Sequence, residues 1–439
     1  MYGYKFTCIY KLTMIYDLHS ALKRHQSARL ADILLSPGNG AGQDIQVETY
    51  GAQVKEEIMK LGKFVVVAAA AAFVMTGSAS AESIKIGFHA PLTGFAAADG
   101  KSALNGAKLA VSQINKAGGV LGKQLELVVY DDQASPKNAV PIANKLIGSD
   151  GVKIAISGSY SGATRAAAGV FQGAKIPYIS AYAVHPAITK AGDYVFRTSF
   201  MGEVQGRAGA KLVGEDLKKK RVVMITLKND FGKSLARGFK EKAKAYGITV
   251  VNEYQYSIKD RQFGAIVAKV KADKPEAIYA TGYFFTAGPL VRQLRAAGVT
   301  ATVIGQEGYD TQKFIEIGGK AAEGTIITTS LDRDSKDPVA RAFITEYQKM
   351  TKAKADMVAA SAHTAVYVMA AALKKAGKLD PVAVRAAIAS TTIKASTGTI
   401  SFNALGEVRK DVQVQIVKGG NWHHHSVISD AKLLAPPEK

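Results

Sequence analysis

The sequence predicts an α/β protein made of two similar lobes, and two observations support this class. Between residues 83 and 329, near-continuous apolar segments typical of strands alternate with segments whose apolar residues have helical spacing. This alternation is typical of parallel sheets covered by helices on both faces. One doubly wound sheet would need too many strands, so two lobes fit better, with a ligand cleft at the carboxyl ends of their strands.

The first half of the pattern begins with a strand at residues 83–88, where apolar and polar residues alternate. A helix is predicted over 103–117, and Gly118 ends it. Pro136 suits the first turn of a helix, because the N–H that proline lacks has no partner there. The other elements predicted before residue 200 are strands at 124–130, 153–157 and 177–181, and helices at 136–147 and 163–175.

The same alternation resumes near residue 204. It predicts helices at 204–217, 232–246, 262–272 and 286–297, and strands at 221–227, 249–256, 277–282, 302–305 and 324–329. The pattern then becomes purely helical, at 338–351, 358–376 and 381–389. Strands return at 399–402 and 412–417, which periodicity alone assigns to neither lobe.

Residues 59–81 have the pattern of an export signal. A basic start at Met59 precedes apolar residues from Phe64 to Met75, and small residues follow as far as Ala81. We therefore predict a Sec-type signal peptide cleaved after Ala81, and a periplasmic location. The apolar segment spans about 18 Å as a helix, too short for a bilayer core of about 30 Å.

Residues 1–58 precede the signal and are interpreted as a mis-assigned start or a disordered extension. They contain the only cysteine, Cys8, so we expect the mature chain to have no disulfide or thiol chemistry. No second apolar span is predicted after the signal, which disfavours a membrane-linked receptor.

The charge balance is basic, with 57 Lys+Arg against 36 Asp+Glu and a net charge of +21. Such an excess suggests nucleic acid or an anionic membrane as partner. However, the basic residues are scattered, and the densest run is only Lys218 to Arg221. We expect a basic soluble surface and no nucleic-acid partner. The composition, 47% apolar and 21% charged, excludes a mostly disordered or collagen-like chain.

Two segments resemble motifs for phosphate binding or acyl transfer, but each lacks a required residue. The residues from Phe231 to Ser234 resemble the end of a P-loop, but Leu227 stands where the first glycine is required. No dinucleotide-binding glycine motif follows the first strand, so no cofactor is expected. The segment from Gly158 to Gly162 lies at a strand-to-helix turn, as a nucleophile elbow does, but Tyr160 occupies the serine position.

The one histidine cluster, His423 to His425, is a weak metal motif. Adjacent residues on a strand point to opposite faces, so the three side chains cannot all bind one ion. We predict a solvated terminal segment there and no metal site.

The turn at Ser161 has a second use. Ser161 would cap a helix that begins near Ala163, which leaves free N–H groups beside a hydroxyl. That arrangement can hold a small carboxylate. Plain N-capping would give the same pattern, so position alone does not separate the two roles.

Longer stretches resemble the periplasmic branched-chain amino-acid-binding proteins, the type I solute-binding components of ABC importers. The similarity covers residues 83–420, and the stretches that carry it are 84–87, 91–94, 113–123, 130–132, 136–146, 176–180, 194–198 and 292–298. It implies the type I periplasmic binding protein fold: two Rossmann-like lobes joined by three crossovers, with the ligand cleft between them. Placed near residues 202, 331 and 411, the crossovers divide the chain into lobe 1 (82–202 and 332–411) and lobe 2 (203–331 and 412–439).

The resemblance implies ligand contacts from lobe 1. Ser161 matches the family serine that holds the ligand carboxylate, and Gly162 to Thr164 match the turn behind it. Tyr182 and Ala183 match positions that offer backbone groups.

It also implies contacts from lobe 2. Tyr283 and Glu307 match groups that close on the ligand, and Glu307 would pair with a ligand ammonium. Phe231 matches an aromatic residue in the loop after the first lobe 2 strand.

Two positions depart from the family pattern. Val184 stands where amino-acid binders carry a Thr or Ser that touches both ends of the ligand. Asp99 stands where a Tyr is usual, and it also fits a turn residue. Tyr160 and Tyr182 add bulk near the ligand. These departures leave an amide, a smaller amino acid or an aromatic acid open as the ligand.

The function that the resemblance implies is a periplasmic solute-binding protein. It would capture an amino acid or a related small carboxylate or amide by hinge closure. It would then deliver this ligand to an ABC permease and its ATPase subunits, as a monomer and without catalysis. The alternatives are a secreted serine hydrolase that uses Ser161, or a ligand-sensing module.

Overall fold

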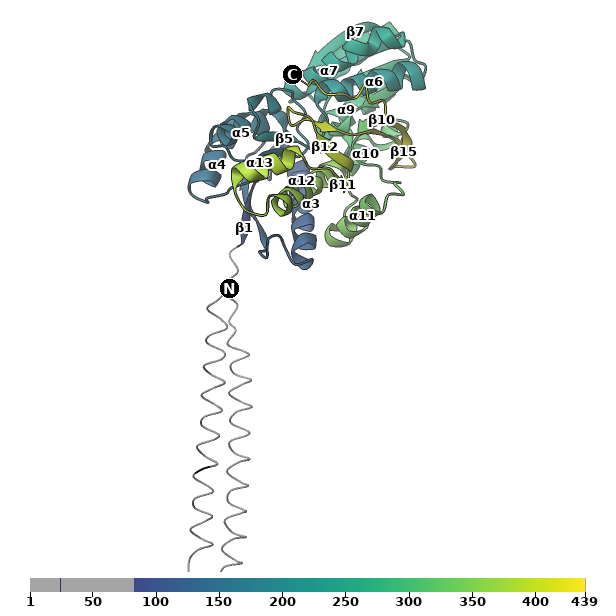
Figure 1. Ribbon diagram of the computed structural model, residues 1–439. Helices are drawn as coiled ribbons and strands as arrows, with labels where there is room; N and C mark the ends of the chain where they lie inside the picture. The colour runs from purple at the N-terminus through teal and green to yellow at the C-terminus, as the bar shows by residue number, and fades with distance from the viewer. Residues whose placement is uncertain (1–23, 25–82, 439) are drawn as a thin grey trace, which may run out of the picture. The chain divides into compact units, whose positions relative to one another are not determined.

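The computed structural model describes residue 24 and residues 83–438 (Figure 1). The predicted signal peptide at 59–81, and the interpretation of residues 1–58 other than 24, lie outside the described residues. The fold below is therefore that of residues 83–438.

The first lobe is built on a five-stranded parallel sheet of order β2-β1-β3-β4-β5. Its strands are β1 (Ile84–Ala90), β2 (Leu125–Asp131), β3 (Ala155–Ser157), β4 (Tyr178–Ser180) and β5 (Val195–Arg197). The connecting helices are α3 (Ala97–Lys116), α4 (Pro136–Gly148) and α5 (Ser161–Gly173). Ile84, Ile86 and Phe88 of β1 are fully buried, as expected for a central strand with helices on both faces.

The second lobe repeats this order and extends it. Its seven-stranded sheet has the order β15-β14-β10-β9-β8-β6-β7, in which β7-β6-β8-β9-β10 matches the first lobe strand for strand. The strands are β6 (Arg221–Leu227), β7 (Thr249–Tyr256), β8 (Ala277–Ala280), β9 (Thr302–Gly305), β10 (Ile326–Thr329), β14 (Val412–Lys418) and β15 (Asn421–Ile428). The helices are α6 (Gly202–Lys211), α7 (Asp230–Ala243), α8 (Gly264–Asp273), α9 (Phe284–Ala296) and α10 (Gln312–Gly318).

The purely helical stretch returns to the first lobe. It forms α11 (Pro338–Thr351), α12 (Met357–Ala376) and α13 (Pro381–Ala389), and both α11 and α12 pack on α3. A small antiparallel sheet follows, with strands β11 (Ile393–Ala395), β12 (Gly398–Phe402) and β13 (Val408–Arg409). The short helical turns are η1 (Gly94–Ala96), η2 (Thr189–Ala191), the π-helical η3 (Leu212–Asp216), η4 (Lys244–Tyr246), η5 (Glu307–Tyr309) and η6 (Gly319–Ala322).

Helix α12 corrects one expectation from the sequence. It is an apolar span beyond the predicted signal peptide, because its length and composition would allow it to cross a membrane. However, 83% of its apolar window is buried inside the protein. We therefore assign α12 as a core helix of the first lobe.

The chain passes between the two lobes three times, and the two sheets confirm the predicted two-lobe α/β class. The passages lie between β5 and α6, between β10 and α11, and between β13 and β14. The lobe boundaries near residues 202, 331 and 411 stay a prediction.

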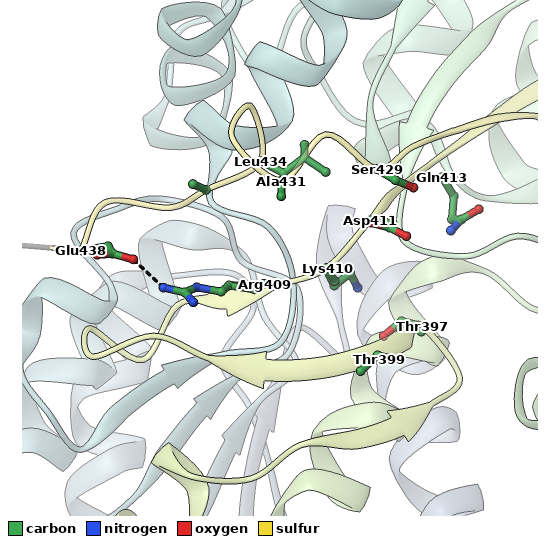
Figure 2. A pocket seen from close by; sticks show the side chains of 12 residues that line it. Thr397, Thr399, Arg409, Lys410, Asp411, Gln413, Ser429, Ala431, Leu434 and Glu438 are labelled. Carbon is green, nitrogen blue, oxygen red and sulfur yellow. Dashed lines mark hydrogen bonds and ion pairs between the residues drawn. The ribbon is translucent and has the colours of Figure 1, made fainter.

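An open depression of about 550 Å³ lies beside the third passage. Figure 2 shows Lys410 and Asp411 at this passage, Thr399 of β12 with Thr397 in the turn before it, and the C-terminal segment that carries Leu434 and Glu438. Glu438 forms an exposed ion pair with Arg409 at this rim (Figure 2).

The histidine cluster is solvated as predicted, but it belongs to a paired edge strand and not to an unpaired terminal segment. Residues 423–425 lie within β15, which pairs antiparallel with β14 at the edge of the second sheet. His423 and His424 are half-exposed and face Asp334 and Asp332 respectively. Among the residues that the structure describes, no cluster of His, Cys, Asp and Glu could hold a metal ion.

Candidate ligand-binding site

A small cavity lies between the lobes, with walls from both. The space open to the centre of a water molecule is about 20 Å³, room for about one water. The residues that line it are Asp99, Tyr160, Ser161, Tyr182, Ala183, Phe231, Tyr283, Glu307, Gly308, Met357 and Val358. Most of them follow the carboxyl ends of parallel strands, where open α/β sheets bind ligands.

The first wall is the turn between β3 and α5. A Cβ on Gly158 would lie 2.5 Å from the Phe88 ring, so the backbone at this turn requires glycine. Helix α5 begins at Ser161 itself, with Tyr160 as N-cap and no side-chain cap. The predicted capping role of Ser161 is therefore wrong. Its Oγ instead accepts a hydrogen bond of 3.3 Å from the Val184 N–H.

The segment after β4 forms the next part of this wall. The Tyr182 hydroxyl donates to the Gly158 carbonyl at 2.8 Å, which ties the segment to the β3–α5 turn. Arg197 is fully buried and donates to the carbonyls of Ala183 and His185, both at 2.8 Å. Glu407 forms an ion pair of 3.0 Å with this guanidinium. Buried charge thus fixes the backbone at Ala183.

Asp99 lies in the first turn of α3, not in an irregular turn. It is 5% exposed, and the Tyr160 hydroxyl donates to its Oδ2 at 2.6 Å. Burial raises the pKa of Asp99 to about 7; the Tyr160 bond opposes this rise, and Asp356 and Asp310 add to it.

Aromatic rings from both lobes meet across the cavity. Tyr160 of the first lobe stacks on Tyr283 of the second, with centroids 4.2 Å apart and planes 10° apart. Phe231 stacks against Tyr283 at 4.7 Å. Tyr283 is the N-cap residue of α9 and Phe231 lies in the first turn of α7, so both follow strands of the second sheet. These contacts leave little free space between the lobes.

Glu307 lies in η5, directly after β9. The close approach of two loops positions this turn: Gln306 donates to the Gly282 carbonyl at 2.9 Å, and a Cβ on Gly308 would lie 2.2 Å from that same oxygen. Ser199 of the first crossover donates to Glu307 Oε2 at 3.1 Å. Oε1 of Glu307 is buried and has no hydrogen-bond partner among the described residues.

The environment of Glu307 disfavours its charged form. Burial raises its pKa to about 8, which the Ser199 bond and the charges of Lys410 and Arg197 oppose only in part, while Asp310 adds to the rise. Desolvation lowers the pKa of Lys410 to about 7, although the charge of Glu307 opposes this shift. No Lys, Arg or His is among the residues that line the cavity.

The structure brings together most of the residues that the resemblance implied. Asp99, Tyr160, Ser161, Tyr182, Ala183, Phe231, Tyr283 and Glu307 all line the cavity. Three do not. Thr164 is buried behind the turn, where its hydroxyl meets that of Ser157 at 2.7 Å. Gly162 faces Pro136, and the fully buried Val184 contributes its backbone N–H to Ser161.

Sequence reasoning missed several residues of this region. Met357 and Val358 line the cavity from the start of α12, and Gly308 lies beside Glu307. The Ser199 hydroxyl donates to Glu307, and the Arg197 guanidinium donates to the Ala183 carbonyl. Asp356 caps α12 by accepting a hydrogen bond from the Ala359 N–H. An Asp directly before an apolar helical pattern marks a helix N-terminus in the sequence, and this signal could have indicated the wall formed by Met357 and Val358.

Comparisons with known proteins agree with this architecture. A family model described as periplasmic binding protein matches residues 83–421. The chain is 32% identical to the leucine-, isoleucine-, valine-, threonine- and alanine-binding protein of Pseudomonas aeruginosa over 381 residues, 86% of this chain and 100% of that protein. The chain therefore belongs to the periplasmic binding protein family, as its sequence indicated.

Two solved structures share the fold. One is the branched-chain amino acid transporter substrate binding protein LivJ from Streptococcus pneumoniae in complex with isoleucine, at 28% identity and a TM-score of 0.74. The match covers 79% of this chain and 99% of that one. The other is a solute binding protein of an ABC transporter from Rhodopseudomonas palustris in complex with 3,4-dihydroxy benzoic acid, at 25% identity and a TM-score of 0.74. That match covers 80% of this chain and 98% of that one.

Proposed function

We propose that this chain is the periplasmic substrate-binding component of an ABC importer and that it captures an α-amino acid between its lobes. It delivers the amino acid to a membrane permease and its ATPase subunits. One observation carries the choice of ligand: Glu307 Oε1 is buried and unpartnered beside a cavity that no basic side chain lines. A buried carboxylate without a partner is costly, and a ligand ammonium would relieve that cost.

The opposite wall suits the other end of an amino acid. The first N–H groups of α5 have no intrahelical acceptor, and the helix N-terminus carries partial positive charge. The Ser161 hydroxyl lies in the same turn. A carboxylate held there, with the ammonium at Glu307, would join the two lobes through one zwitterion.

An aromatic acid fits the same walls less well. The relative from Rhodopseudomonas palustris is named as a complex with 3,4-dihydroxy benzoic acid, and stacked rings line this cavity too. Such an acid has no ammonium, so it would leave Glu307 unpartnered and would place its charge near Asp99 and Glu307. We therefore place the amino acid first.

Hydrolysis by Ser161 has little support in the geometry. Within the described part of the chain, the hydrogen bond of the Ser161 side chain is with the Val184 N–H, and no histidine accepts from its hydroxyl. A nucleophilic serine needs an adjacent base. The relatives named above are also described as binding proteins, not as enzymes.

The test combines binding, turnover and shape. The mature chain, purified from the periplasm, is screened by thermal shift against amino acids, amides and aromatic acids, and hits are measured by calorimetry. We expect an α-amino acid to bind without chemical change and to reduce the radius of gyration in small-angle scattering, because the ligand selects the closed state. Intact mass should place the N-terminus at Glu82. Steady conversion of an ester, or an unchanged scattering profile at saturation, would contradict the proposal.

A further inference from the structure

We propose that Asp99 is a second cation-binding group in the cavity, so that the ligand is an amino acid whose side chain ends in a positive charge. This inference rests on the proposed amino-acid-binding function and narrows its substrate class to diamino acids. In this binding mode, Glu307 binds the α-ammonium of the amino acid and Asp99 binds the positive charge at the end of its side chain.

Asp99 differs from Asp356 and Asp310, the two aspartates whose charges act on it, in having no charged or backbone partner. Asp356 accepts from the Ser102 hydroxyl and the Ala359 N–H. Asp310 pairs with Arg333 and accepts from the Thr329 hydroxyl. Among the described residues, the one hydrogen bond of Asp99 comes from the Tyr160 hydroxyl to Oδ2. Its other oxygen remains free to accept from a ligand.

The position of Asp99 in the first turn of α3 does not explain why it is buried. An acid in the first turn of a helix gains from the helix dipole, but an exposed side chain gains this without losing its water. Asp99 is 5% exposed, and its pKa is raised to about 7, mainly by burial. Desolvation is the main cause of this rise, and the Tyr160 hydrogen bond opposes it only in part. A buried acid at the wall of a binding cavity is the arrangement expected where a cation is to be bound.

The surrounding rings are compatible with a cation. Tyr160, which holds Asp99, presents its ring to Tyr283, and Phe231 continues the stack. Because these faces cover one another at 4.2 and 4.7 Å, a ligand ammonium would meet a ring face where the bound ligand separates the stack. The buried, unpartnered Oε1 of Glu307 gives the same cavity a second point for positive charge. Two acids and no basic residue among those that line the cavity together favour a ligand with net positive charge.

The test compares two isosteric amino acids, L-ornithine and L-norleucine, which differ only by an ammonium in place of the terminal methyl. Calorimetry at pH 8 keeps that ammonium charged and Asp99 ionised. We expect L-ornithine to bind the wild type about tenfold to a hundredfold more tightly than L-norleucine, as one charge-assisted hydrogen bond allows. Asp99→Asn keeps the shape and an acceptor for Tyr160, and should bring the two affinities within about threefold.

Asp150→Asn is the matched control. Asp150 also accepts from a tyrosine, Tyr130, at 3.0 Å, but it does not line the cavity. This variant should keep the wild-type preference. Equal or tighter binding of L-norleucine by the wild type would overturn the inference while leaving amino-acid binding intact, and so would a preference that survives in Asp99→Asn. If neither amino acid bound while another α-amino acid did, this inference alone would fail. If no α-amino acid bound in the thermal-shift screen, the proposed function would fail and this inference with it. The wild-type comparison needs no variant to fold, and melting curves of both variants show whether their folds are kept.

Discussion

The two lobes have the same strand order but offer the cavity different chemistry. At its α5 wall the first lobe presents a hydroxyl and a helix N-terminus, both at Ser161. The second lobe presents the buried carboxylate of Glu307 and the ring of Tyr283. Because the strand order is repeated, the loops after equivalent strands of the two lobes meet at one cleft. The residue types in those loops then determine which chemical group of a ligand each lobe can bind. In the proposed binding mode, the first lobe holds the carboxylate of the amino acid at Ser161 and the second lobe holds its α-ammonium at Glu307.

The largest effect should come from the carboxylate of the second lobe. Glu307→Gln should weaken binding of an α-amino acid about tenfold to a hundredfold, because a charge-assisted hydrogen bond contributes roughly 1.5–3 kcal/mol. It should leave an acid without an ammonium unaffected or better bound. Calorimetry of both ligand types measures the effect. Glu316→Gln, an exposed change in the same lobe, is the control and should match wild type. Equal amino-acid affinity in both variants would remove Glu307 from the site.

The pH dependence of binding should reveal the same carboxylate. Glu307 has a raised pKa of about 8 in the free protein, where it meets Ser199 and the charges of Lys410, Arg197 and Asp310. A ligand ammonium needs the ionised form, so binding below pH 8 must release a proton. We expect affinity to rise by about tenfold from pH 6.5 to pH 8 and then to level off. Calorimetry in buffers of different ionisation enthalpy counts the protons. Affinity that falls over this range would contradict the assignment.

The hydroxyl of the first lobe should matter less than the carboxylate of the second. Ser161→Ala removes the hydroxyl that donates to the ligand carboxylate, but the N–H groups of the helix N-terminus still hold that carboxylate, so we expect a loss of about twofold to tenfold. The change also removes the acceptor for the Val184 N–H. Melting curves without ligand show whether that loss disturbs the fold. A loss larger than that of Glu307→Gln would reverse the order of the two lobes.

The smallest effect concerns stability without ligand. The folded pKa of Glu307, about 8, exceeds the ordinary value of about 4.3, so the folded state holds a proton that the unfolded state releases between these values. Stability from this group therefore falls as pH rises from about 5 to 8. Glu307→Gln removes this dependence and should raise the melting temperature by about 1–3 °C at pH 8, with little change at pH 5. If the variant is less stable at both pH values, Glu307 anchors its own loop.

The fold could be predicted well because parallel strands that are buried on both faces have nearly continuous apolar sequences. β6 and β9 were placed with the bounds that the structure shows. The short strands β11 and β13 were not predicted, since segments of three and two residues carry no periodicity. β15 was missed because polar residues on an edge strand, His423 to His425 among them, look like a solvated tail.

The site could be predicted only in part. Resemblance identified Ser161 and Glu307, but not that α5 begins at Ser161 or that Ser199 holds Glu307. The bond between Asp99 and Tyr160 joins residues 61 positions apart, which local sequence patterns do not reveal. Met357 lines the cavity because the chain returns to the first lobe after β10. This return is a property of the topology, so local sequence patterns do not predict the contact.

Calorimetry on three related ligands tests the central claim most directly. They are the best-binding α-amino acid, the acid that lacks its ammonium, and the amine that lacks its carboxylate. If the two lobes hold opposite ends of one zwitterion, the amino acid should bind at least about tenfold more tightly than either fragment. Glu307→Gln should remove its advantage over the acid. A fragment that binds the wild type as tightly as the amino acid would contradict the account.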